Sequence, residues 1–205
     1  MPSESFPRGP YGTILVDPPW DQPSGFTDDV NGRYNHLPYE TMSDGDVLSI
    51  PVRQLASKDS LLLLWTTNSK LPVALGALQA WSFRYVGMLT WDKVSEPGPG
   101  VWLKGITEHI LIGVRGRVSP PMITKKGTHW TTLVRSERGH ASKNGVGKGL
   151  SQHSKKPGFA YLLGQDLGPE PRIELFARTR RAGWDAWGNE VQETMQVPLE
   201  MEVVS

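Results

Sequence analysis

The stretch Thr13–Trp20, which reads TILVDPPW, joins a short run of apolar and β-branched residues to a rigid polar turn. Such a run, broken abruptly by Asp17 and two prolines, is typical of a strand buried inside a domain. In open α/β sheets, ligands bind beyond the carboxyl ends of the strands. The stretch therefore predicts a buried strand that delivers Asp17 to a ligand-binding cleft.

The tetrapeptide Asp17-Pro18-Pro19-Trp20 has the chemistry of a surface that binds an NH₂ group. The prolines fix φ and lack backbone donors, so the Asp17 carboxylate and the Pro18 carbonyl form an edge of acceptors. Trp20 offers a flat face for stacking a nucleic-acid base, which is worth roughly 1–3 kcal/mol per base. An ordinary turn with a buried tryptophan would use the same residues, and the tetrapeptide alone leaves both interpretations open.

Further apolar runs of strand length follow the first one. They cover residues 60–66, 86–91, 109–114 and 172–177. The continuous run over 60–66 is typical of a strand buried on both faces. Strands of this kind alternating with helices predict an α/β domain with a mostly parallel sheet and helices on both faces. We expect one domain over 1–205, with 1–10 and 192–205 as flexible tails.

Capping residues indicate where helices begin. Ser43 starts a capping-box pattern and predicts a short helix directly after it. Asn68 or Ser69 is predicted to cap a helix that ends near Trp81, and a third helix is expected from Pro157.

The composition excludes several kinds of site. The chain has no cysteine, which excludes disulfides, thiolate zinc sites and cysteine nucleophiles. His129, His140 and His153 lack the spacing of metal ligands, so no metal is expected. No apolar run approaches the ~20 residues that span a bilayer, and the N-terminus lacks the apolar region of a secretory signal. We therefore expect an intracellular, cytoplasmic protein, with the nucleus or a phage-infected host cell left open.

The net charge of +1 hides a basic segment between Arg115 and Gly158. This segment, predicted to be mostly loop over 116–156, holds ten of the 22 Lys and Arg residues and one of the 21 acids. It favours a surface that faces a polyanion, although a lysine-rich solvated loop would have the same composition. The candidate phosphate contacts are Lys125, Lys126, Arg135, Arg138, Lys143 and Lys148.

The tetrapeptide is one of six blocks that follow one another from about Tyr11 to Val191. The others are 37–43 (LPYETMS), 62–68 (LLLWTTN), 107–116 (TEH and then GVRG), 153–157 (HSKKP) and 174–190 (ELFAR and then GWDAWGNE). Together these blocks resemble the MT-A-70 family of adenine methyltransferases. A lone tetrapeptide would be a weak signal, but six blocks in order over nearly the whole chain are specific.

The resemblance implies a single Rossmann-like methyltransferase domain in permuted order, with the catalytic motif first and the cofactor strand last. It implies an S-adenosylmethionine-dependent enzyme that methylates the exocyclic amine of adenine in nucleic acid. Asp17, Pro18, Pro19 and Trp20 would be catalytic, with Asp17 also near the cofactor. The implied cofactor-binding residues are Tyr39, Lys156, Arg178, Arg180, Asn189 and Glu190. Lys156 would pair with the cofactor's carboxylate.

Two departures from the family pattern concern the cofactor site. Arg180 stands where the eukaryotic catalytic subunit has histidine. The acidic segment that helps to hold the cofactor adenine in larger relatives does not precede the first strand, which leaves Glu108 or a residue of 21–37 as the replacement. Trp184 and Trp187 would pack either against the cofactor adenine or in the core.

The substrate and the partners leave alternatives open. DNA is favoured over RNA because no RNA-binding module is recognisable, and a duplex would have to present a flipped adenine. The alternative functions are a non-catalytic, nucleic-acid-binding partner subunit and a cytosine-amine methyltransferase. Pairing as a homodimer or with a related methyltransferase subunit is also open, and no membrane association is expected.

Overall fold

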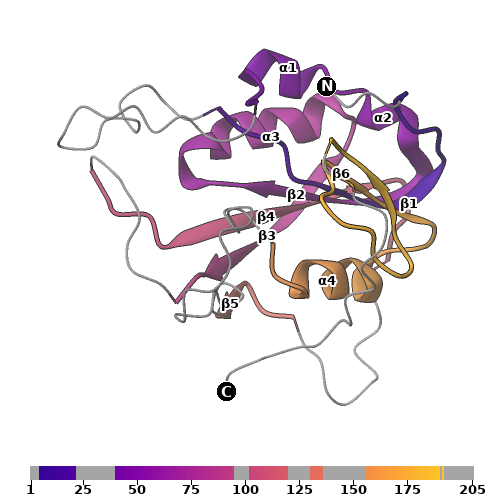
Figure 1. Ribbon diagram of the computed structural model, residues 1–205. Coiled ribbons are helices and arrows are strands. Elements are labelled where there is room, and N and C mark those ends of the chain that lie inside the picture. Colours follow the sequence, from indigo (N-terminus) through magenta and orange to yellow (C-terminus); the bar gives the residue numbers. More distant parts are fainter. Residues whose placement is uncertain are drawn as a thin grey trace, which may run out of the picture.

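The computed structural model describes residues 5–21, 40–94, 102–119, 130–135, 156–189 and 191. Within these residues, seven strands form one sheet in the order β5-β3-β4-β2-β1-β6-β7 (Figure 1). The strands are β1 (Tyr11–Val16), β2 (Ala56–Thr66), β3 (Arg84–Asp92), β4 (Thr107–Arg115), β5 (Leu133–Arg135), β6 (Arg172–Leu175) and β7 (Asp185–Trp187). The α/β class predicted from the sequence is confirmed.

Strand β1 lies near the middle of the sheet and pairs in parallel with β2 on one side and β6 on the other. Val16, its last residue, therefore lies beside Leu64 and Leu175. Strand β4 is antiparallel to both of its neighbours, whereas the other pairings among the described strands are parallel. The prediction of a mostly parallel sheet is confirmed, with β4 as the exception.

Two short strands depart from the sequence predictions. β5 lies in the segment 116–156, which we expected to be mostly loop, and β7 follows the strand that we expected to be the last. Both contain three residues, which is too short for the alternation of apolar and polar residues that identifies a strand. Their pairing with β3 and β6 holds them in the sheet.

The helices among the described residues are α1 (Asp44–Leu48), α2 (Val52–Leu55), the 3₁₀ helix η1 (Asn68–Lys70), α3 (Leu71–Ala80) and α4 (Phe159–Leu167). Ser43 caps α1 as predicted, because its Oγ accepts a hydrogen bond from the backbone N–H of Asp46 at 3.2 Å. The prediction that Asn68 or Ser69 caps the next α-helix is wrong. Those residues form η1, and α3 begins only after Lys70.

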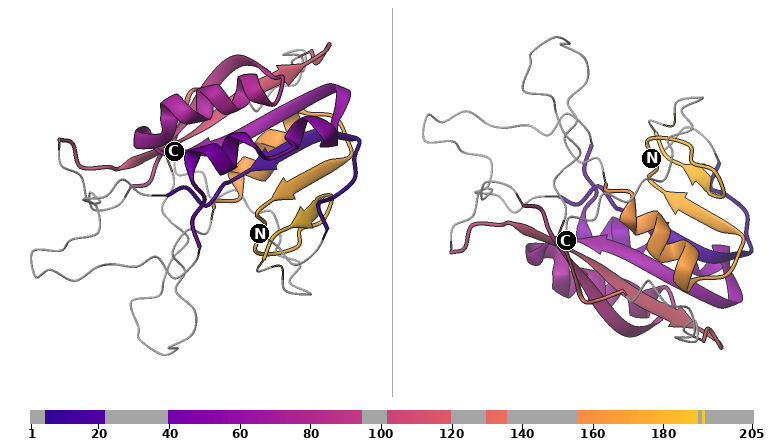
Figure 2. Two further views of the ribbon diagram at one scale, coloured as in Figure 1. Left: turned by 90° about the horizontal axis from the view of Figure 1, so that it is seen from above. Right: turned by 90° about the horizontal axis from the view of Figure 1, so that it is seen from below.

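Helices cover both faces of the sheet, as predicted (Figure 2). One apolar cluster includes residues of α1, α2 and α3, and the other includes residues of α4. Two glycines permit close packing: a Cβ on Gly113 of β4 would lie 2.8 Å from Leu78 of α3, and one on Gly164 of α4 would lie 2.7 Å from the Trp184 ring.

The first described residues also pack on this framework. Phe6 meets the Trp187 ring edge-to-face, with 5.0 Å between the ring centroids. Among the described helices, none has the length and apolar character needed to cross a bilayer.

Candidate active site

Asp17 directly follows β1, at the edge of the sheet where the parallel strands end. Because β4 runs in the opposite direction, it begins at this edge, and its second residue is Glu108. The antiparallel strand therefore brings a second carboxylate to the end of the sheet that carries the first. Asp17 and Glu108 are therefore close in space because of the direction of their strands, although they are far apart in the sequence.

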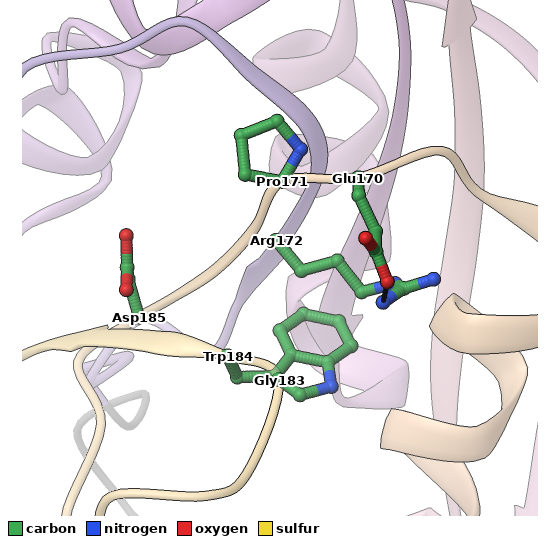
Figure 3. Close-up of a pocket in the computed structure, with 6 residues that line it drawn as sticks. All are labelled: Glu170, Pro171, Arg172, Gly183, Trp184 and Asp185. Carbon is green, nitrogen blue, oxygen red and sulfur yellow. Dashed lines mark hydrogen bonds and ion pairs between the residues drawn. The ribbon is translucent and has the colours of Figure 1, made fainter.

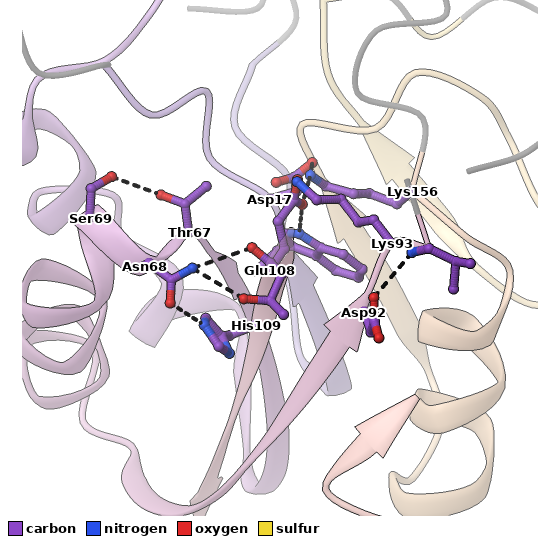
Figure 4. A network of polar contacts seen from close by, with 12 residues as sticks. Asp17, Thr67, Asn68, Ser69, Asp92, Lys93, Glu108, His109 and Lys156 are labelled. Carbon is purple, nitrogen blue, oxygen red and sulfur yellow. Dashed lines mark hydrogen bonds and ion pairs between the residues drawn. The ribbon is translucent and has the colours of Figure 1, made fainter. Parts of the chain in front are cut away.

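Lys156 lies between these two carboxylates (Figure 4). Its Nζ is 3.3 Å from Asp17 Oδ2 and 3.3 Å from Glu108 Oε2, and it lies 4.8 Å from the centroid of the Trp65 ring. Glu108 also accepts a hydrogen bond from Trp65 Nε1 at 2.6 Å and pairs with Lys93 Nζ at 3.2 Å. We call Asp17, Lys93, Glu108 and Lys156 the charge centre. Its two acids and two bases balance, as burial of charge requires.

The surroundings give the two acids of the charge centre different proton affinities. Burial raises the pKa of Asp17 above its ordinary value, and the charge of Lys156 limits the rise. Burial acts in the same direction on Glu108, but Lys156, Lys93 and the Trp65 hydrogen bond outweigh it and lower the pKa of Glu108 to about 2. Burial lowers the pKa of Lys156, and its two carboxylates more than compensate, so that this pKa is raised. Asp17 is thus the more basic carboxylate.

Backbone hydrogen bonds hold the tetrapeptide after Asp17. The Pro18 carbonyl accepts the Trp20 N–H at 2.8 Å, and the Pro19 carbonyl accepts the Met42 N–H at 2.8 Å. Trp20 and Met42 also form a parallel β-bridge. One of the two lone pairs of the Pro18 carbonyl is thus already in use, and the acceptor edge of Asp17 and Pro18 stays a prediction.

The prediction that Trp20 offers a free face for stacking a base is wrong. Trp20 is 5% exposed and belongs to an apolar core cluster. Its indole N–H donates to the Trp65 carbonyl at 3.0 Å. Trp20 therefore anchors the tetrapeptide to β2, which is the second interpretation that the sequence left open.

Strands β6 and β7 end at the same edge as β1 because all three are parallel. Glu174 of β6 is buried and accepts a hydrogen bond from the Tyr161 hydroxyl at 2.8 Å. Burial raises the pKa of Glu174 to about 7, although the Tyr161 hydrogen bond lowers it. After β6, Phe176 adopts φ of 63°, in the left-handed region that residues other than glycine seldom occupy. Such strain is common near functional sites.

Three of the expected cofactor residues follow these two strands. Arg178 is half-buried, and its charge lowers the pKa of Asp17. Arg180 and Asn189 are exposed. Trp184 and Trp187 are 6% and 5% exposed, and each belongs to a core cluster, which favours packing in the core over the alternative of a cofactor contact.

His109, next to Glu108, is a hydrogen-bonded core residue. Its Nε2 lies 2.9 Å from Asn68 Oδ1 and its Nδ1 lies 3.1 Å from Thr90 Oγ1. Burial lowers its pKa, which favours the neutral ring. The side chain is therefore satisfied without a ligand.

Other predicted site residues lie outside the described part of the chain. They are Tyr39, Glu190, Lys125, Lys126, Arg138, Lys143 and Lys148. Of the predicted phosphate contacts, Arg135 alone is described. It is 69% exposed and its Nε lies 3.1 Å from Asp92 Oδ2, so its charge is partly balanced.

Sequence reasoning missed Lys93 and considered Glu108 only as a contact for the cofactor adenine. The available signal is that each is a charged residue at the end of a long apolar strand, and such residues meet when the strands are neighbours. Within the described residues, no group of three or more His, Asp and Glu side chains is arranged to bind a metal ion.

A pocket of about 500 Å³, shown in Figure 3, is formed where β6 and β7 begin, at the end of the sheet opposite Asp17. Its walls are Glu170, Pro171, Arg172, Gly183, Trp184 and Asp185. These residues lie where β6 and β7 begin, whereas Asp17 lies where the parallel strands end. The pocket is therefore separate from the charge centre.

A family model and several known methyltransferases match this chain over most of its length. The MT-A70 family model matches residues 11–190. The chain is 27% identical over 215 residues to a type II methyltransferase, M.MunI, from Mycoplasma sp, an alignment that covers 96% of the chain and 85% of M.MunI. It is 28% identical to a probable N(6)-adenosine-methyltransferase MT-A70-like protein from Oryza sativa, over 89% of the chain and 23% of that protein. It is also 28% identical to the human N(6)-adenosine-methyltransferase catalytic subunit METTL3, over 89% of the chain and 28% of that protein. The chain thus spans most of M.MunI and about a quarter of the two eukaryotic relatives.

Proposed function

This chain belongs to the MT-A70 family, and on that premise we propose that it transfers a methyl group from S-adenosylmethionine to the exocyclic amine of adenine in DNA. Members of this family are adenine N6-methyltransferases that use S-adenosylmethionine. The assignment of residues to roles and the choice of DNA are the proposal. The observation that carries it is the position of Asp17, a carboxylate with raised pKa at the end of β1, beside a buried lysine.

Asp17 and the Pro18 carbonyl together bind the adenine amine. This nitrogen is a weak nucleophile because its lone pair is conjugated with the ring. Two acceptors that hold its hydrogens turn the lone pair out of conjugation, and the Pro18 carbonyl keeps one lone pair free for this purpose. Positioning of this kind supplies a large part of the barrier reduction in enzymes.

Lys156 fits the carboxylate of the methyl donor. Its ammonium group has three donors, and its two carboxylate partners lie at 3.3 Å, farther than the ~2.7–2.9 Å of a tight charge-assisted hydrogen bond. A further carboxylate can therefore bind to it. Arg178, Arg180 and Asn189 follow β6 and β7, where they would hold the rest of the cofactor, so that the catalytic motif comes first in the chain and the cofactor strand last.

When bound, S-adenosylmethionine would supply a methyl group made electrophilic by its sulfonium sulfur. The lone pair of the amine nitrogen would form the new bond to this carbon, and the electron pair of the broken S–C bond would stay on the sulfur. The amine then has one hydrogen too many, and Asp17 is suited to take this proton because its pKa is raised. Glu108, whose pKa is lowered to about 2, keeps its charge and stabilises Lys156 instead. The proton passes from Asp17 to solvent before the next turnover.

DNA is the proposed polymer because the likeness extends over 85% of M.MunI, and type II methyltransferases modify DNA. The likeness to the adenosine methyltransferases is confined to about a quarter of each. The side chain of Asp17 is 20% exposed, so an adenine stacked in a duplex does not reach it. The target base must therefore leave the helix, as in other enzymes that modify bases.

Methyl transfer from labelled cofactor to separate pools of DNA and RNA, followed by nucleoside analysis, tests the proposal. We expect N6-methyladenine in the DNA pool, and its loss with the Asp17→Asn variant. Label in RNA alone would overturn the choice of polymer, and label in cytosine would overturn the choice of base. No label in either pool, from wild-type protein that binds the cofactor, would overturn the activity.

A further inference from the structure

Lys70 is a buried lysine to which the proposed chemistry assigns no role. It ends η1, is 7% exposed and donates hydrogen bonds to Asp21 Oδ1 and to Asp44 Oδ1, the latter at 2.7 Å. Burial lowers the pKa of Lys70, but the two aspartates more than compensate, so that this pKa is raised. A buried ammonium group must be paired to remain charged, and here two carboxylates share it. We call Lys70, Asp21 and Asp44 the Lys70 clamp.

The two aspartates of the Lys70 clamp belong to two different segments of the chain. Asp21 directly follows Trp20, and Asp44 is the first residue of α1. Lys70 therefore joins the residue that directly follows the tetrapeptide to the start of α1.

The backbone makes the same connection beside the clamp. Met42 donates to the Pro19 carbonyl at 2.8 Å, and Asp21 donates to the Met42 carbonyl at 3.3 Å. These two hydrogen bonds tie the tetrapeptide to Met42, and the Trp20 indole N–H ties it to β2 at 3.0 Å. The clamp adds a part-buried, charge-assisted tie at the next residue, and such ties are stronger and more directional than neutral ones.

We propose that Lys70 is a positioning residue of the active site, which holds the end of the tetrapeptide so that the Pro18 carbonyl and Asp17 keep a fixed geometry toward the amine. The inference rests on the proposed function, because it assumes that this acceptor edge binds the amine. A displacement of about 1 Å in such a site can cost on the order of 10²-fold in rate. Loss of the Lys70 charge should therefore slow methyl transfer while leaving cofactor binding at Lys156 intact.

The test compares Lys70→Met, which keeps the length of the side chain without its charge, with Lys70→Arg, which keeps the charge. Lys58→Met is the matched control, because Lys58 is an exposed lysine at the other end of β2. The measurements are the single-turnover rate of methyl transfer from labelled S-adenosylmethionine to unmethylated DNA of mixed sequence, the Kd of the cofactor and the thermal unfolding curve.

We expect the Lys70→Met rate to fall about 10- to 100-fold, the Lys70→Arg rate to recover in part, and the cofactor Kd to change less than about twofold. The Lys58→Met variant should match the wild type in all three measurements. If Lys70→Met does not fold, Asp21→Asn, which removes one arm and leaves Asp44 in place, should show the same split between rate and Kd. An unchanged rate in a folded variant, or a parallel loss of rate and cofactor binding, would overturn the inference. Failure of the wild type to methylate adenine would instead overturn the proposed function.

Discussion

Two lysines, each paired with two carboxylates, contact the first residue of the tetrapeptide and the residue that follows its last, and their contacts differ. Lys156 in the charge centre has both carboxylate partners at 3.3 Å, and those acids are 20% and 13% exposed. Lys70 in the clamp contacts Asp21 and has Asp44 at 2.7 Å, and the side chains of those acids are 43% and 44% exposed. Lys156 therefore has longer contacts to the less exposed pair of acids, whereas Lys70 has a shorter contact in a more exposed pair.

The difference in contact length suits one lysine to binding a ligand and the other to fixing the chain. A lysine with long contacts can exchange or add a partner, which suits a group that must receive the carboxylate of a small molecule. A lysine with short contacts keeps its partners, which suits a group that fixes the chain. The cost of removing each lysine also differs, because carboxylates left unpaired in the interior are far less well hydrated than those at the surface. The predictions that follow test this distinction.

Asp17→Asn should have the largest effect on turnover. The amide that replaces the carboxylate turns a donor toward the amine and cannot take its proton. Removal of one preorganised group of this kind typically costs on the order of 10³-fold in rate. Single-turnover methyl transfer at saturating cofactor measures the loss, with thermal unfolding as the check on folding. More than a tenth of wild-type activity in a folded variant would contradict the assignment.

Lys156→Met should weaken cofactor binding roughly 300-fold, because truncating one partner of a buried charge pair costs several kcal/mol. It should also lower the free energy of unfolding by about 3 kcal/mol, since Asp17 and Glu108 lose their shared cation. Calorimetric titration and denaturant unfolding measure the two quantities. Lys70→Met provides the contrast, because its cofactor Kd should stay near the wild-type value. Equal losses of cofactor affinity in the two variants would remove the distinction between the lysines.

The dependence of the free energy of unfolding on pH should distinguish the contribution of Glu108 from that of Glu174. Glu108 has its pKa lowered to about 2, so its stabilisation is complete above pH 4.5 and is lost as pH falls toward 2. Glu174 has its pKa raised to about 7, so its protonated form favours folding at low pH and this contribution is lost as pH rises from 4.5 to 7. Each of these two contributions to the free energy of unfolding is at most about 3 kcal/mol.

Denaturant unfolding across this pH range, with Glu108→Gln and Glu174→Gln as the variants, distinguishes the two contributions. Glu174→Gln should flatten the curve between pH 4.5 and 7, and Glu108→Gln should flatten it below pH 4.5. A Glu174→Gln curve that keeps its slope between pH 4.5 and 7 would show that another group titrates there.

Arg135→Ala should have the smallest effect, because this cation is exposed and belongs to neither buried group. Its pair with Asp92 contributes less than about 1 kcal/mol to stability. As a phosphate contact, however, it should lower DNA affinity a few-fold and reduce the slope of affinity against salt by about 1. DNA binding at several salt concentrations gives both values. An unchanged slope would remove Arg135 from the DNA-binding surface.

The fold was predictable to the extent that it follows from patterns within single segments. The apolar run over 60–66 forms the C-terminal part of β2, and the Ser43 pattern forms the cap of α1. What could not be predicted depends on pairing between distant segments. The direction of β4 and the existence of β7 follow from neighbours in the sheet, which no local pattern records.

The same limit applies to the site. Asp17 was identifiable because two prolines mark the end of its strand, and the match to HSKKP drew attention to Lys156. The sequence does not show that Lys156 meets Glu108, 48 positions away, or that Trp20 turns its N–H to the backbone of β2. Lys70 could not be singled out at all, because nothing in the local sequence separates a lysine that is buried between two aspartates from one at the surface.

The direction of β4 also determines which part of the molecule is free to diversify. Because β3 and β4 are antiparallel neighbours, the chain between Asp92 and Thr107 leaves and re-enters the sheet at the end that carries Asp17. A hairpin connection can gain or lose residues without changing the register of the two strands. Here that freedom begins only after Lys93, because Lys93 pairs with Glu108 and its N–H donates to the Ile106 carbonyl at 3.1 Å. The fold therefore places a connection whose length can change at the edge of the sheet that carries the reaction centre.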